Sequence, residues 1–146
     1  MHWAVTEAGK EADVVVMAAA VADYTPKKTF DGKIKKSADD MTIELSRTKD
    51  ILKELGEHKG ERILVGFAAE ADDMERYAKD KLKRKNLDMI VANDISRKDI
   101  GFGTQENEVT LYYKDGSSSS IDKCGKDIVA KRILDDVMRM MEDRND

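Results

Sequence analysis

Short apolar segments alternate along the chain with segments whose apolar residues recur at helical spacing. Asp13–Met17, Ile63–Phe67 and Asp88–Ala92 are almost continuously apolar, which is typical of strands buried on both faces of a parallel sheet. Helical spacing predicts the end of a helix near the N-terminus and three further helices, over residues 50–58, 72–86 and 126–141.

Two other segments have the alternating pattern of strands with one buried face. Thr42–Ser46 predicts a half-buried strand, and Glu108–Tyr113, a turn at Asp115-Gly116 and Ser119–Asp122 predict an antiparallel hairpin. We therefore expect an α/β fold, with a mostly parallel sheet flanked by helices and an antiparallel hairpin near the C-terminus. We expect residues 1–146 to form a single domain.

Composition narrows the class of protein. Charged residues make up 38% of the 146 residues, but the formal net charge is only −4, so the surface is unlike the basic face of a nucleic-acid-binding protein. The sequence has no signal-peptide pattern and no long apolar run. The single Cys124 cannot form an internal disulfide, and His2 and His58 have no metal-ligand spacing. We expect a soluble cytoplasmic protein without nucleic-acid or membrane partners.

The segment after the first apolar run is the first candidate for ligand binding. Ala18, Ala19, Ala20 and Ala22 come directly before Asp23. Ligands of open α/β folds bind at the carboxyl ends of strands, where small side chains would let a ligand approach the backbone. The alanines could instead pack under a helix. Asp23 could hold a ribose hydroxyl or Mg²⁺, or it could cap the following turn.

A glycine and a group of lysines follow. Gly32 precedes the segment Lys33–Lys36, which reads KIKK. Such a segment suits a mobile flap that carries positive charge onto phosphates. The alternative is a solvated edge strand that its lysines protect from pairing with other chains. Together with the strand, the alanines and the aspartate, the lysines favour the flap.

The long charged helix and the other strand ends supply further candidates. Lys81 and Lys85 lie in line with the apolar stripe of the helix, so they meet an anion or extend to solvent. Cations near a helix C-terminus are also favoured by its dipole. This helix should run antiparallel to the strands, which would take its end away from their carboxyl edge. Phe67 could contact a base or fill the core, and Asn93 and Asp94 follow the third apolar strand.

Five stretches of these candidate regions, AAAVADY, GKIKKS, VGFAAE, KLKRKNLD and VANDIS, closely resemble bacterial phosphopantothenate–cysteine ligase, the synthetase part of a bifunctional coenzyme A biosynthesis flavoprotein. The resemblance implies a Rossmann-like sheet and ligation of 4′-phosphopantothenate to L-cysteine through an acyl-cytidylate, with CTP as cosubstrate and Mg²⁺ as cofactor. It also implies a homodimer and, in the full protein, a flavin-binding phosphopantothenoylcysteine decarboxylase domain.

The resemblance also assigns residues. It implies that Lys33 is the catalytic flap lysine that acts on the acyl-cytidylate. The family's Asn-Pro-Asp-Ile segment reads Thr-Lys-Asp-Ile here, a change that backbone contacts would tolerate. The residues implied to contact CTP are Met17, Ala18, Ala19, Asp23, Lys33, Lys49, Asp50, Ile51, Leu52, Phe67, Lys81 and Lys85. The metal ligands are left open.

Family members have an upstream strand, a Gly-rich turn and an Arg/Asn motif that helps to hold phosphopantothenate, and this chain has no counterpart of them. We therefore expect it to keep most nucleotide contacts and to lose part of the acid site, so that the isolated chain could be inactive. The alternative function is a non-catalytic nucleotide-binding or dimerisation fragment, with the EVTLYY hairpin as a dimer edge. A dinucleotide oxidoreductase is disfavoured because no G-x-G-x-x-G occurs.

Overall fold

The computed structural model describes residues 1–35, 40–70, 73–94, 96 and 103–145. Two residues of the predicted elements, Lys36 of the flap and Asp72 of the long helix, lie outside this range. The contacts divide the chain into two compact units, one of Met1–Ala18 with Ile51–Asp146 and one of Ala19–Asp50. The sequence led us to expect a single domain, and we describe the two units separately.

The larger unit is built on a five-stranded sheet with the strand order β1-β4-β5-β6-β7. The first three of these strands, β1 (Val14–Met17), β4 (Ile63–Glu70) and β5 (Met89–Asp94), are parallel. Two antiparallel strands, β6 (Glu106–Tyr113) and β7 (Ser118–Gly125), complete the sheet. This arrangement confirms the predicted fold class.

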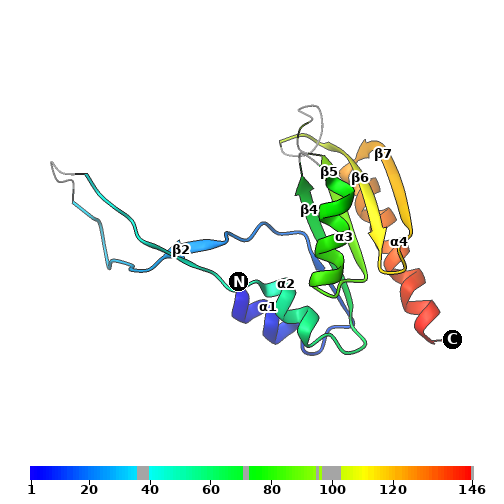
Figure 1. Cartoon of the computed structure of the whole chain (residues 1–146), viewed down its shortest axis with the longest axis horizontal. Coiled ribbons are helices and arrows are strands. Elements are labelled where there is room, and N and C mark those ends of the chain that lie inside the picture. Colours follow the sequence, from blue (N-terminus) through cyan, green and yellow to red (C-terminus); the bar gives the residue numbers. More distant parts are fainter. Residues whose placement is uncertain (36–39, 71–72, 95, 97–102, 146) are drawn as a thin grey trace. The chain divides into compact units, whose positions relative to one another are not determined.

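Helices cover both faces of the sheet, and Figure 1 shows α3 and α4 on opposite sides of it. The helices of this unit are α1 (His2–Ala8), α2 (Ile51–Glu57), α3 (Met74–Arg84) and α4 (Lys126–Asn145). The sheet has a hydrophobic core on each face, and side chains of β4 alternate between the two. Leu64 packs with the helices α2 and α3 on one face, and Val65 packs with α4 on the other. None of the helices in the described part of the chain is both long and apolar enough to cross a membrane.

Gly66 of β4 is required by packing. A Cβ at this position would lie 2.8 Å from side-chain carbons of both Leu52 and Leu87, which is closer than real Cβ atoms come to other atoms. The small residue in the VGFAAE stretch therefore serves the core under α2 rather than the approach of a ligand.

Two burial predictions for the larger unit need correction. The segment Asp13–Met17 was expected to be buried on both faces, but β1 is only partly buried and Val16 is exposed, because β1 lies at the edge of the sheet and has β4 as its only neighbour among the described strands. The apolar stripe of α4 is only partly buried. Val129, Ile133 and Val137 face the sheet, whereas Ile128, Leu134, Met138 and Met141 point away from it and are exposed.

The smaller unit is a two-stranded antiparallel ribbon, which Figure 1 shows as the segment that carries β2. Its strands are β2 (Tyr24–Pro26) and β3 (Leu45–Arg47), and the Arg47 guanidinium lies 5.8 Å from the centre of the Tyr24 ring. The predicted half-buried strand over 42–46 is therefore wrong in bounds and burial, since Ile43 and Leu45 are exposed. A ribbon of two strands has no second layer in its own unit against which an apolar face could be buried.

Candidate functional site

The carboxyl ends of β1, β4 and β5 lie at one edge of the sheet, which we call the carboxyl edge. Met17 at the end of β1 pairs with Gly66, so β4 continues four residues beyond that pair, to Glu70. Glu70 in turn pairs with Asp94 at the end of β5. The parallel strands therefore end at different levels. Residues Phe67–Glu70 of β4 and the end of β5 extend past the end of β1, and we call this offset the step.

On the α4 side of this step lies a cavity of about 300 Å³. Phe67 lines it and is 36% exposed, which shows that its ring does not simply fill the core. The cavity brings Ala18 and Phe67, two of the predicted CTP contacts, to one place. Its complete lining is Ala18, Phe67, Asn93, Asn107, Lys126, Val129, Ala130 and Ile133.

On the α3 side of the same edge, Lys81 forms an ion pair with Glu70. The Lys81 Nζ lies 2.5 Å from Oε1 of Glu70, and the two side chains are 31% and 21% exposed. Since α3 begins near the carboxyl edge and runs back along the sheet, Lys81 is still close enough to reach the last residue of β4. The expectation that this helix would take its lysines away from the edge is wrong for Lys81.

Lys85 is placed differently from Lys81. Lys85 follows α3 directly, as its C-cap residue. Its backbone is packed against α2, because a Cβ on Gly56 would lie 1.9 Å from the Lys85 carbonyl oxygen. The side chain of the next residue, Asn86, donates a hydrogen bond to the Gly56 carbonyl at 3.0 Å. Three residues later β5 starts, so the Lys85 backbone lies toward the amino ends of the strands.

The segment Lys49–Leu52 crosses the boundary between the two units. Ile51 and Leu52 begin α2 and their side chains are buried in the core, so any contact that these two residues make with a ligand comes from the backbone. Lys49 and Asp50 belong to the smaller unit and are exposed.

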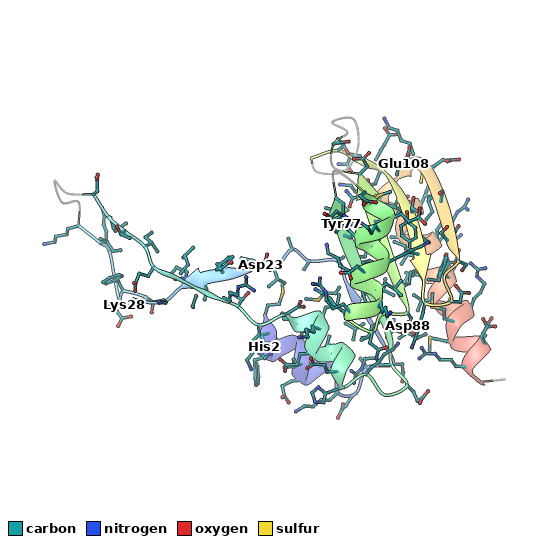
Figure 2. All side chains as sticks on the ribbon, viewed as in Figure 1. His2, Asp23, Lys28, Tyr77, Asp88 and Glu108 are labelled. Atoms are coloured by element: carbon teal, nitrogen blue, oxygen red, sulfur yellow. The ribbon has the colours of Figure 1, made fainter. Side chains whose placement is uncertain are left out.

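The other predicted site residues, Ala19, Asp23 and Lys33, also belong to the smaller unit and are exposed. Asp23 comes directly before β2 (Figure 2), and its backbone carbonyl accepts a hydrogen bond from the Thr48 amide at 2.9 Å. Gly32, directly before Lys33, has a φ of +98°, a left-handed conformation that favours glycine. The backbone turn predicted in front of the lysines is therefore present.

At the opposite edge of the sheet the structure contains a buried charge cluster that the sequence analysis missed. Asp88 precedes β5 (Figure 2) and accepts hydrogen bonds from Lys59 Nζ at 2.6 Å, from Arg144 at 2.7 Å and from the Leu64 amide at 2.8 Å. Burial lowers the pKa of Lys59, and the hydrogen bond with Asp88 acts against this effect. Since the partners lie far apart in the sequence, no local motif could have revealed the cluster.

In the part of the chain that the structure describes, no three His, Cys, Asp or Glu side chains lie close enough together to hold a metal ion. Glu70 and Asp94 are register partners at the carboxyl ends of β4 and β5. One Oδ atom of Asp94 is already engaged by the amide and hydroxyl of Ser96, at 2.8 and 2.6 Å.

The fold and the edge together define an α/β protein that offers polar groups and a cavity where parallel strands end, the usual ligand position of such sheets. The model of the family described as DNA/pantothenate metabolism flavoprotein C-terminal domain matches residues 1–141. The chain therefore belongs to this family.

Individual relatives agree with the family match. The chain is 51% identical over 137 residues to the coenzyme A biosynthesis bifunctional protein CoaBC of Bacillus subtilis, with 94% of this chain and 34% of the relative covered. The crystal structure of the C-terminal domain of a CoaBC protein is similar with a TM-score of 0.78 and 42% identity, over 97% of this chain and 61% of that one.

A more distant structure, a Cab2 mutant in complex with phosphopantothenate-cysteine, has a TM-score of 0.65 and 17% identity, with 97% of this chain and 51% of that chain covered. At this identity the likeness is one of fold. The chain spans 34% of the length of the Bacillus relative, so the activity of the longer protein is a matter for proposal.

Proposed function

We propose that the chain provides the nucleotide-binding part of a CTP-dependent phosphopantothenate–cysteine ligase in coenzyme A biosynthesis. The observation that carries the proposal is that Ala18, Phe67 and Lys81, which the resemblance assigns to CTP, all lie at the carboxyl edge of one sheet. The 51% identity with a protein named for coenzyme A biosynthesis supports it.

The proposed reaction has two steps. The carboxylate of 4′-phosphopantothenate attacks the α-phosphorus of CTP, which forms an acyl-cytidylate and expels pyrophosphate. The amine of L-cysteine then attacks the acyl carbon, which forms the amide and releases CMP and a proton. Neither step needs a side-chain nucleophile, so catalysis rests on positioning and on neutralising negative charge. Lys33, exposed on the smaller unit, is the group proposed to neutralise charge on the acyl-cytidylate.

Magnesium fits this proposal as a companion of the nucleotide. Mg²⁺ in such sites is held by substrate phosphates together with one or two carboxylates. Among the residues that the structure describes, the chain offers single carboxylates of this kind, such as Asp23, rather than a preformed group of ligands. We therefore propose that Mg²⁺ arrives with CTP and neutralises part of the triphosphate charge.

A homodimer is part of the proposal. The ribbon of the smaller unit exposes several large apolar side chains, those of Tyr24, Phe30, Ile34, Met41, Ile43 and Leu45. Two-stranded ribbons are marginally stable in water on their own, so a second copy of the chain is the partner that we propose for this surface. The EVTLYY hairpin, expected to provide the dimer edge, consists of β6 and β7, and β7 is the last strand of the described sheet. The hairpin therefore stays a second candidate for the dimer surface.

The first test is CTP binding by the 146-residue chain in the presence of Mg²⁺, measured by titration calorimetry. We expect saturable binding with one site per chain, and a chain that binds no CTP would overturn the proposal. Pyrophosphate release, measured with and without 4′-phosphopantothenate, then distinguishes the two functions considered above. Release that requires the acid identifies a competent half-reaction, whereas CTP binding without release favours the non-catalytic nucleotide-binding fragment.

A further inference from the structure

The helix α4, on the opposite side of the sheet from α3 (Figure 1), carries a second row of apolar side chains that faces away from the sheet. Leu134, Met138 and Met141 are 53%, 58% and 37% exposed, and we call these three residues the outer row. Single exposed apolar residues are normal on a protein surface, whereas a continuous apolar patch marks an interaction site. Methionine is common on such surfaces because its unbranched side chain adapts to its partner.

The outer row has the spacing of a coiled-coil seam. Residues 127, 131, 134, 138, 141 and 145 follow one another at alternating intervals of four and three positions. Such an alternation keeps one narrow face of a helix against a second helix. The outer row fills the middle of this series over eight residues, about two helical turns, and both ends of the series are polar. A short partner helix with the same pattern would therefore match it.

A second copy of α4 provides this match when the two helices run antiparallel. About a twofold axis, a position further toward the C-terminus of one helix lies level with a position further toward the N-terminus of the other. Placing Leu134 opposite the partner's Met138 therefore places Lys131 opposite the partner's Met141 and beside the partner's Glu142. The methylene groups of Lys131 would cover the methionine, and its ammonium would meet the carboxylate.

The charges at the ends of the outer row favour this arrangement. Arg139 and Arg144 of the same helix are paired with carboxylates of their own chain. Lys131 and Glu142, in contrast, form no ion pair within the part of the chain that the structure describes. In an antiparallel pair of helices, these two charges meet twice, once on each side of the twofold axis. A parallel pair would place each of them beside its own copy, where like charges repel.

We propose that the outer row is an interface with a second copy of this chain, in which two α4 helices pack antiparallel. The interface goes beyond the proposed function, because the outer row contains none of the residues assigned to CTP. It does not use the ribbon of the smaller unit, so chains that also pair through the ribbon form assemblies larger than dimers. A single pair of helices makes a small interface, and we expect reversible association with a Kd on the order of 10–100 µM.

The first experiment is sedimentation equilibrium of the 146-residue chain at increasing concentration. Met138→Glu places one carboxylate from each copy in the apolar centre and should weaken association about 30-fold or more. The matched control is Ile128→Glu, because Ile128 is an equally exposed apolar residue of α4, at 47%, that lies outside the outer row. It should leave the association constant within about twofold of the wild-type value. Circular dichroism checks that both variants fold.

An exchange of charges tests the antiparallel arrangement. Lys131→Glu and Glu142→Lys, each made alone, turn both ion pairs of the symmetric interface into repulsions and should each weaken association about tenfold. The variant that combines the two changes restores opposite charges at both places. We expect it to associate within about threefold of the wild-type chain, since only a partner's position 142 that faces position 131 can compensate the first change.

Each outcome decides for or against the interface. A wild-type chain without an association step that Met138→Glu weakens would overturn it, and a different partner would then have to cover the outer row. Equal weakening by Met138→Glu and Ile128→Glu, or a combined charge variant as weak as the single ones, would also overturn it. A failure of the chain to bind CTP would overturn the proposed function and leave this interface standing, because association is measured without nucleotide.

Discussion

A lysine–carboxylate ion pair lies at each end of the parallel strands of the larger unit, and the two pairs differ in burial. We call the end at which the amino ends of these strands lie the amino edge. At the carboxyl edge, Lys81 and Glu70 are joined by one contact and stay partly exposed. At the amino edge, Lys59 and Asp88 are each 6% exposed by side chain, and Asp88 is held in addition by Arg144 and the Leu64 amide.

A charge that is buried and fully hydrogen-bonded inside the protein has nothing left to offer a ligand, whereas a pair that is only half buried can exchange partners. The comparison therefore separates a structural cluster from a candidate binding pair of the same composition. The predictions below test this comparison and the proposed role of Lys33 in the smaller unit.

The largest effect is expected from breaking the amino-edge cluster. Asp88→Ala leaves the buried Lys59 ammonium without its carboxylate and removes the anchor of Arg144, which belongs to the last turn of α4. Loss of one member of a buried ion pair costs about 3–5 kcal/mol, to be measured by urea denaturation. The control is Asp80→Ala, whose pair with Arg84 is exposed and is worth less than about 1 kcal/mol. If both variants lose the same free energy of unfolding, the buried cluster stabilises the fold no more than an exposed ion pair does.

The next effect concerns catalysis and the smaller unit. Under the proposed ligase function, Lys33→Gln should slow amide formation by about 100-fold, the scale of losing one charge-stabilising group, while the acyl-cytidylate accumulates. Rapid-quench detection of the intermediate is the measurement. Lys28→Gln, a change at another exposed lysine of the same unit, should leave turnover unaltered, and unaltered turnover in Lys33→Gln would remove Lys33 from the mechanism.

Two neighbouring positions on one face of β4 should separate stability from binding. Val65 is fully buried against α4, and Phe67, two residues further, lines the cavity at the carboxyl edge. Val65→Ala should lower the free energy of unfolding by about 2 kcal/mol through the cavity that it creates, with little change in CTP affinity. Phe67→Ala should lower CTP affinity about fivefold, near 1 kcal/mol, with a smaller loss of stability. If Phe67→Ala instead lowers the free energy of unfolding and leaves the CTP affinity measured by calorimetry unchanged, Phe67 serves the core and not the binding site.

The smallest effect is a pH dependence of stability. Because burial lowers the pKa of Lys59 in the folded protein, the unfolded chain binds more protons at this residue between the lowered pKa and the usual lysine value of 10.5. Its contribution to stability should therefore rise with pH in that window. Denaturation at several alkaline pH values, compared with Lys59→Met, checks the sign, and a slope that Lys59→Met retains would have to come from other groups.

The local pattern of the sequence determined the elements of the larger unit. Continuous apolar segments predicted β1, β4 and β5, and helical spacing predicted α2, α3 and α4, because each element must place its apolar residues at the period of its own backbone. The parallel order of the strand–helix alternation then put Ala18 and Phe67 at one edge. The candidate residues of the carboxyl edge could thus be found from spacing and resemblance.

Only the tertiary structure decided which partners these residues have. Glu70 and Lys81 are 11 positions apart, and Asp88 gathers groups 24, 29 and 56 positions away. Such pairs depend on which strands become neighbours and on where each helix lies along the sheet, and neither quantity appears in a local pattern. For the same reason the sequence predicted too much burial for β1, β3 and the exposed side of α4. Apolar spacing shows that a face can be buried, but only the packed neighbours decide whether it is.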